Sequence, residues 1–523
     1  MKAGFAAGGK YILLRLPLPI RRKFGIEMHP MKKNILILTL VAVSLAGRAA
    51  LPQPDLVAQI HFAGGNNVSG DKNYAAFTNE FSSAEARALR AQTADKLAKF
   101  FAAWFAENSG AQVAGGAAKL RPLLDDLQNA EWYLEARTVG GKAEAALAVK
   151  TSDAGAQVWQ SGLKPFFPDA TFERANGWLI CGTGANAPKI AGKISALNGA
   201  WLALDLNWPA LGKFFPSVKE LDLPETKFTV TATATDLKVD GKFLFPGNIS
   251  APLEPWRVPT NTLRSPFVSF TAVRGFSAWL DAQPWAADYK ISPMPNQLFT
   301  WVLPQIPFQV FAALPCADSL SALRQAQDRL QPLVAAARAK NEMPFPISME
   351  PTNRQLNFIG LPGVAPSLEA VNSSAGQFLL AAGFPNTARS RSPLPPELFS
   401  RLAQKNLLFY HWEITAERMP PLLQMSQFAL MASWHKQLGG DTASLKWLQK
   451  IGPALGYTRT EVFQTAADEM TFTRQSPGAF TAVELFALAN WLEADNFPGC
   501  NLKMPPRKTR PNRQATPAPM PGR

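Results

Sequence analysis

Cysteine is scarce in this chain of 523 residues, and its spacing carries no metal or haem signature. The three cysteines, Cys181, Cys316 and Cys500, are odd in number and far apart, and none forms a C-x-x-C pair. One disulfide is compatible with the sequence, which does not select the pair. For Cys181 and Cys316 we expect buried free thiols at strand ends.

Histidine is equally rare, with four residues, and the usual reactive motifs are absent. The sequence contains no G-x-S-x-G, H-E-x-x-H, P-loop or calcium-loop pattern. His411 and Glu413 form an H-x-E pair on an expected strand, so their side chains share one face. No third metal ligand lies nearby in sequence, and we therefore predict no metal site and a hydrogen-bonded strand histidine.

Long apolar runs are missing, because even the run from Ile35 to Ala46 falls short of the roughly 20 residues that a spanning helix needs. Lys32 and Lys33 precede this run, and small residues ending at Ala49 follow it. A basic start, a short apolar stretch and a small-residue exit are the three parts of a secretory signal. Residues 31–49 therefore predict a signal peptide, and hence an exported bacterial-type protein, periplasmic or extracellular. Residues 1–30 are either an extended basic start of that signal or a start-site artefact, which we favour.

The net charge of +14 is confined to the two ends of the chain. Residues 1–49 carry +8 and residues 501–523 carry +6, which leaves the body between them neutral. A neutral body argues against a nucleic-acid partner, since such partners bind basic surfaces. The basic, proline-rich tail at 501–523 is expected to be disordered, either as a solvated extension or in weak contact with an anionic surface.

The body has ample apolar material for packed cores, including 34 Phe and 14 Trp. A strand is expected at Leu56–Phe62 and a helix at Ser83–Glu107. Phe228, Val230 and Ala232 alternate with threonines, so one face of that strand is apolar and the other is coated with threonine. Asp240-Gly241 is expected to turn the chain into the next strand. These patterns predict an α+β fold in which antiparallel sheet packs against helices.

The second half of the chain repeats the order of elements in the first. Phe267–Val273 and the helical stretch after it resemble the opening strand and helix, and Gln377–Ala382 resembles Trp178–Gly182. We predict a tandem duplication of two related units. Their boundaries are 50–251 and 264–495, with a proline-containing link between them.

The sharpest local motif follows the strand at Trp178. Gly182 and Gly184 precede a helix-like segment, and Asp205 lies about twenty residues further on, in a second strand. Over about thirty residues this layout resembles the Rossmann dinucleotide fingerprint, which implies a pyrophosphate at the glycines and a ribose at Asp205. The motif lies in mid-chain after hairpin patterns, and an exported protein rarely meets free NAD. We retain a dinucleotide-binding oxidoreductase as a minor alternative and expect no cofactor.

A second motif is Ser433-Trp434-His435-Lys436, which has the S-x-x-K spacing of penicillin-binding enzymes. Its companion motifs are absent, and it is interpreted as the polar end of a helix that begins near Met419.

Two classes of function remain open at this level. The export signal, the duplication and the lack of clustered active-site residues favour a non-catalytic periplasmic or envelope-associated protein that binds or scaffolds. The alternative is an exported hydrolase with dispersed catalytic residues, either carboxylates, which need no local motif, or a serine without a recognisable motif. After signal cleavage we expect no integral membrane segment.

Overall fold

The computed structural model describes residues 55–499, except for 75–79, 81, 110–112, 140, 183–189, 191–193, 195, 215–222, 250, 264–265, 284–292, 305–308, 340–346, 362–363, 385–395 and 434–440. The sequence-based assignments for residues 1–30, 31–49, 501–523 and Cys500 lie outside the described residues.

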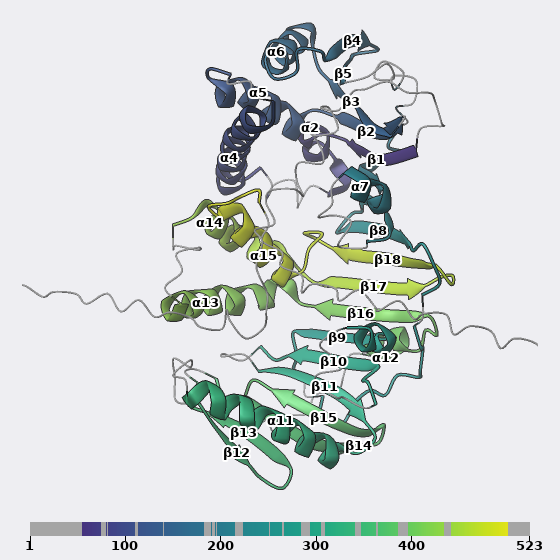
Figure 1. The fold of residues 1–523 in the computed structure, drawn as a ribbon, viewed down its shortest axis with the longest axis vertical. Coiled ribbons are helices and arrows are strands. Elements are labelled where there is room, and N and C mark those ends of the chain that lie inside the picture. The colour runs from purple at the N-terminus through teal and green to yellow at the C-terminus, as the bar shows by residue number, and fades with distance from the viewer. Residues whose placement is uncertain are drawn as a thin grey trace, which may run out of the picture.

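The 18 strands in the described part of the chain join in one sheet, and every neighbouring pair is antiparallel (Figure 1). From one edge to the other the order is β4-β5-β3-β2-β1-β6-β7-β8-β18-β17-β16-β9-β10-β11-β15-β14-β13-β12. The strands of the first half of the chain are β1 Asp55–Phe62, β2 Trp132–Val139, β3 Lys142–Lys150, β4 Thr171–Ala175, β5 Trp178–Gly182, β6 Ala200–Leu206, β7 Glu225–Ala232 and β8 Leu237–Leu244. Those of the second half are β9 Ser269–Arg274, β10 Gln297–Val302, β11 Val310–Cys316, β12 Ser348–Pro351, β13 Gln355–Ile359, β14 Ser367–Ser373, β15 Gly376–Ala382, β16 Leu407–Glu413, β17 Thr458–Gln464 and β18 Glu469–Ser476.

The pairing order runs outward in the same way on both sides of the β8–β18 ladder. On one side it is β8-β7-β6-β1-β2-β3-β5-β4, and on the other it is β18-β17-β16-β9-β10-β11-β15-β14. The second half adds β12 and β13 at its edge. The ladder itself pairs Leu237–Leu244 with Glu469–Ser476 along their full lengths.

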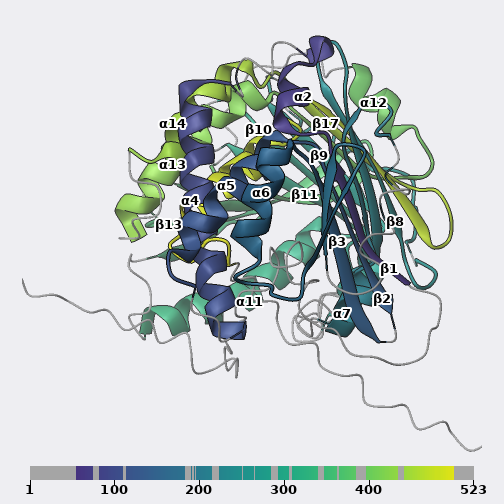
Figure 2. The same ribbon diagram turned by 90° about the horizontal axis from the view of Figure 1, so that it is seen from above.

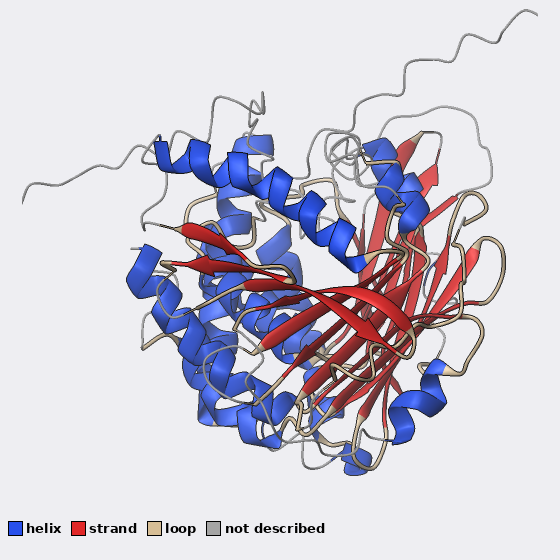
Figure 3. Cartoon of the chain, turned by 90° about the horizontal axis from the view of Figure 1, so that it is seen from below, coloured by secondary structure: helices blue, strands red, loops and turns tan. Residues whose placement is uncertain are grey.

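Most helices stand on one side of this twisted sheet, which we call the helix side (Figures 2 and 3). The helices are α2 Gly65–Ser69, α4 Ala84–Ser109, α5 Gly116–Asn129, α6 Asp153–Leu163, α7 Trp208–Phe214, α9 Ser277–Asp281, α11 Ser319–Ala339, α12 Pro396–Leu402, α13 Thr415–Ser433, α14 Ala443–Ile451 and α15 Ala482–Glu493. Of these helices, none in the described part of the chain is long and apolar enough to cross a membrane.

Helix α4 belongs to the cores of both halves. Its C-terminal part, with Phe101 and Phe105, packs with α5, α6 and the first strands. Its N-terminal part, with Ala86 and Leu89, packs with α13, α14 and α15. The two halves are therefore joined through this helix as well as through the β8–β18 ladder.

The alternation in Phe228–Ala232 produces the expected strand, β7, but the expected turn at Asp240-Gly241 is wrong. The chain turns earlier, at 233–236, where Thr233 and Asp236 hydrogen-bond to each other. Gly241 instead lies inside β8, where the ring of Phe228 occupies the space that a side chain would need. A Cβ at Gly241 would lie 2.2 Å from that ring.

The opposite side of the sheet, the far side, is closed over the second half by α12 and by the link at 251–263. Two guanidinium groups hold this link, that of the buried Arg274 and that of the half-buried Arg257. Arg257 donates to the carbonyl oxygens of Ala375 and Cys316 at 3.2 Å each. Arg274 donates to the carbonyls of Glu254 at 2.6 Å and Leu407 at 2.8 Å.

Replacing Arg274 with methionine should lower the free energy of unfolding by about 3 kcal/mol, because the carbonyls that it satisfies would lose a charged donor in a buried place. Urea denaturation would measure the change. Arg324→Met, at an exposed position on α11, is the control and should change stability little. Equal effects of the two substitutions would contradict a clamping role for Arg274.

Candidate functional site

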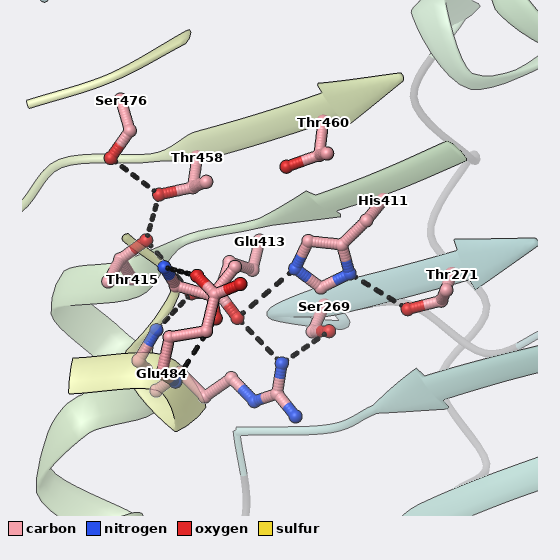
Figure 4. Close-up of polar contacts among 12 residues, drawn as sticks. Ser269, Thr271, His411, Glu413, Thr415, Thr458, Thr460, Ser476 and Glu484 are labelled. Atoms are coloured by element: carbon pink, nitrogen blue, oxygen red, sulfur yellow. Dashed lines mark hydrogen bonds and ion pairs between the residues drawn. The ribbon is translucent and has the colours of Figure 1, made fainter. Parts of the chain in front are cut away.

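A polar cluster lies on the helix side in the second half, where β9, β16, β17 and β18 meet the first turns of α13 and α15 (Figure 4). Most of its side chains come from neighbouring strands at matching register positions, so alternation places them on one face, and two come from the first turn of α13. We define the polar cluster as Ser269, Thr271, His411, Glu413, Thr415, Arg418, Thr458 and Ser476.

Glu413 is the centre of the polar cluster and is fully buried. One carboxylate oxygen accepts the backbone N–H of Ala482 at 2.7 Å and the hydroxyl of Thr415 at 3.0 Å. The other accepts Arg418 Nη1 at 2.6 Å. Because Ala482 is the first residue of α15, the carboxylate also meets the positive end of that helix. One buried charge thus joins β16, α13 and α15.

These contacts keep Glu413 ionised. Burial alone would raise its pKa, but His411, Arg418 and the Ala482 amide lower it to about 2.

Beyond Glu413, the hydroxyls of Thr415, Thr458 and Ser476 form a chain, with oxygen separations of 2.7 and 2.9 Å. The buried oxygens of this chain are therefore paired with one another.

His411 connects the polar cluster to the middle of the sheet. Its Nδ1 lies 2.8 Å from Thr271 Oγ1, and its Nε2 lies 3.4 Å from Glu413 Oε2, which is long for a hydrogen bond. A carboxylate beside Nε2 favours the tautomer that carries its proton there, so that Nδ1 accepts the Thr271 hydroxyl. Thr271, His411 and Glu413 therefore form a hydroxyl–imidazole–carboxylate series.

An apolar row crosses the sheet beside the polar cluster. Its members are direct cross-strand partners on nine consecutive strands, and each is only half-buried. With neighbouring strands about 4.8 Å apart, the row is about 38 Å long. The apolar row consists of Ile60, Leu204, Phe228, Gly241, Phe472, Val462, Phe409, Val273 and Leu298.

The apolar row differs from the packed cores on the same side of the sheet. Ile60 packs at the margin of the first core, whereas the row from Leu204 to Leu298 belongs to none of the core clusters among the described residues. Rings gather at its middle, where Phe228 lies 5.7 Å from Phe472. On the same face, two residues away from Phe409 and Val273 along their strands, lie His411 and Thr271. The apolar row therefore borders a polar strip.

A separate cavity of about 420 Å³ opens between α11 and the edge strands β12 and β13. Val334, Met349 and Leu356 contribute its apolar lining, and Arg338 is the charged residue in that lining. Among the described residues no group of titratable side chains converges there, so this lining offers little chemistry beyond apolar contact.

The residues of the dinucleotide motif are not brought together. Gly182 ends β5, which pairs antiparallel with both β3 and β4, while Gly184 lies outside the described residues. Asp205 lies on β6, separated from β5 by three strands, and pairs with Lys227 at 2.7 Å. The fingerprint needs two adjacent parallel strands, so this arrangement gives the dinucleotide interpretation no support.

The remaining candidates are scattered. His61 faces the far side of β1 and lies 3.1 Å from Glu131, away from His411. Lys436 of the S-x-x-K motif lies outside the described residues. Cys181 and Cys316 are free thiols near strand ends, as expected, but only Cys181 is buried and Cys316 is half-buried. Burial raises the pKa of Cys181 to about 12.

Sequence reasoning found His411 and Glu413 but missed their partners. Thr271 is 140 positions away from His411 in the chain, and only the β9–β16 pairing brings it near. Arg418 carried a local signal, because it lies one turn into a helix that begins just after Glu413. Within the described ranges, no group of three or more His, Cys, Asp or Glu side chains could hold a metal ion.

The low pKa of Glu413 predicts acid sensitivity. The ionised carboxylate contributes fully above pH 4.5, the ordinary pKa of such a group, and its contribution of about 3 kcal/mol is lost as the pH falls towards 2. Glu413→Gln should lower stability at pH 7 and flatten its decline between pH 4.5 and 2, as measured by urea denaturation across that range. The exposed control Glu173→Gln should keep the decline of the parent protein. An unchanged slope in Glu413→Gln would refute the assignment.

Compared with family models, with curated proteins and with solved structures, the chain matches none of them.

Proposed function

We propose that this chain is an exported binding protein, periplasmic or envelope-associated, which holds a ligand with a long apolar chain along the apolar row. The observation that carries the proposal is the row itself, a continuous, half-buried apolar strip on nine paired strands. Soluble proteins rarely leave a contiguous apolar strip open unless it meets a partner or a ligand.

The far side of the same strands supports this choice by contrast. Lys227, Lys242 and Asp240 alternate there with threonines, and ion pairs such as Lys242–Glu469 at 2.8 Å join neighbouring strands. The central strands are thus polar where they face solvent on the far side and apolar where they face the helices. An apolar chain would exchange water for this surface at about 25 cal/mol per Å² of apolar area buried.

The row also favours an extended ligand over a compact one. A compact apolar molecule needs a concave pocket. The row instead consists of one residue from each strand, and each residue is the direct cross-strand partner of the next. An acyl chain lying across the strands could contact consecutive members without any change in the sheet.

The duplication belongs to the same proposal, since the row depends on both halves. Two contacts support it beyond the pairing order. At the start of α7, Trp208 Nε1 donates to Thr226 Oγ1 at 3.1 Å, and at the start of α13, the hydroxyls of Thr415 and Thr458 lie 2.7 Å apart. Thr226 and Thr458 are both buried on the strand that follows the helix.

Binding is tested with a fluorescent long-chain fatty acid and two substitutions at adjacent positions of β18. Phe472→Asp places a carboxylate in the apolar row and should weaken binding about tenfold or more, because the chain would bury an unpaired charge. Thr471→Asp changes the far side and should leave the affinity unchanged. Circular dichroism confirms that both variants fold, and Val462→Thr provides a milder probe of the row. Equal affinities in all the variants would refute this binding site.

Export is tested separately by N-terminal sequencing of the protein secreted from a bacterial host. The mature chain should begin near Ala50, since the small residues Gly47 and Ala49 form the expected cleavage site. A product that retains residues 31–49 would overturn the localisation without affecting the binding proposal.

A further inference from the structure

We propose that Thr271 is a catalytic nucleophile that cleaves the ester bond of an acyl compound held along the apolar row. The inference rests on the proposed function, because the row supplies the binding of the acyl chain. It identifies the bound ligand as a long-chain ester. It also gives the protein a hydrolase activity, the alternative function that the sequence leaves open.

The geometry at Thr271 is that of an activated hydroxyl. Thr271 Oγ1 lies 2.8 Å from His411 Nδ1, and His411 Nε2 faces the Glu413 carboxylate at 3.4 Å (Figure 4). A nucleophile within hydrogen-bond reach of a base, with that base oriented by a third group, is the arrangement that acyl-transfer enzymes share. The three residues come from two adjacent strands, β9 and β16, so the sheet fixes their spacing.

Glu413 acts here as a positioning residue. Its charge is fixed by Arg418 and by the Ala482 amide, so the carboxylate stays ionised while it faces His411. An anion beside Nε2 keeps the proton on that nitrogen, which leaves the Nδ1 lone pair directed at Thr271. The imidazolium that forms when His411 takes the threonine proton would be stabilised by the same anion.

Thr271 also occupies the right place relative to the apolar row. Val273, two residues further along β9, is a row member, and so is its cross-strand partner Phe409. Thr271 is itself half-buried on the helix side, in contrast to the enclosed Glu413. A chain lying on the row would therefore bring its ester group to the adjoining polar strip.

Thr300 lies directly opposite Thr271 on β10 and shares its face. Directly opposite side chains in an antiparallel pair have Cβ atoms about 4.5–5.5 Å apart. A second hydroxyl at that separation can donate to the oxygen that becomes negative when the ester carbonyl is attacked.

The reaction balances without any additional reactant except water. Thr271 Oγ1 bonds to the ester carbonyl carbon while its proton passes to His411 Nδ1. The bond from that carbon to the alcohol oxygen breaks, and the departing alcohol takes the proton from His411. Water then adds to the acyl-threonine with the same base, releasing the fatty acid and restoring the hydroxyl.

The test uses the full exported chain and a long-chain alkyl fluorophosphonate, which forms a covalent bond with an activated hydroxyl as fluoride leaves. We expect a single adduct that mass spectrometry of peptides places on Thr271. Thr271→Val, of nearly equal shape, should abolish it, and Thr271→Ser should retain it. His411→Gln should slow labelling by about 100-fold, the contribution typical of a general base. Thr229→Val, on the far side of β7, is the matched control and should label like the parent protein.

Fatty-acid binding is measured on the same variants to separate the two proposals. Glu413→Gln should retain the binding of the fluorescent fatty acid while its labelling slows, a split that loss of folding would not produce. Normal fatty-acid binding with no adduct, or an adduct that persists in Thr271→Val, would overturn the nucleophile and leave the binding proposal intact. A parent protein that does not bind the fluorescent fatty acid would instead refute the proposed function.

Discussion

The β8–β18 ladder is the interaction on which the rest of the architecture depends. Eight residue pairs, from Leu237–Ser476 to Leu244–Glu469, turn the sheets of the two halves into one. The ladder fixes the register between β8 and β18. The alternation of side chains along the strands of one half therefore determines which side chains face the helices in the other half. A slip of one residue would move Phe472 to the far side and interrupt the apolar row at its centre.

One buried charge then places two helices of the second half, α13 and α15. Removing a carboxylate from water is costly, and Glu413 offsets that cost with a guanidinium, a hydroxyl and the first N–H of α15. The first of these partners is on α13, so the two helices share one anchor on β16. On its other side, His411 lies between the buried Glu413 carboxylate and the hydroxyl of the half-buried Thr271.

Local sequence determined the elements whose stabilising contacts are themselves local. The capping box of Thr481 and Glu484 lies within one helical turn, and both of its hydrogen bonds are present. Gly241 shows the limit of such reasoning, because the need for a glycine at this strand position comes from the ring of Phe228 on another strand. The site shows it again, since His411 and Glu413 are visible as a pair while Thr271 is joined to them only by strand order.

The two halves differ most at the polar cluster around Glu413. Under the proposed duplication, Leu206 at the end of β6 corresponds to Glu413 at the end of β16, because each lies opposite a buried threonine of the following strand, Thr226 or Thr458. Leu206 packs in an apolar cluster and needs no partner, whereas Glu413 requires Arg418 and the start of α15. In the second half His411 lies between this carboxylate and the Thr271 hydroxyl, whereas the first half has the apolar Leu206 at the corresponding position. The apolar row is therefore shared by both halves, while the polar cluster belongs to one.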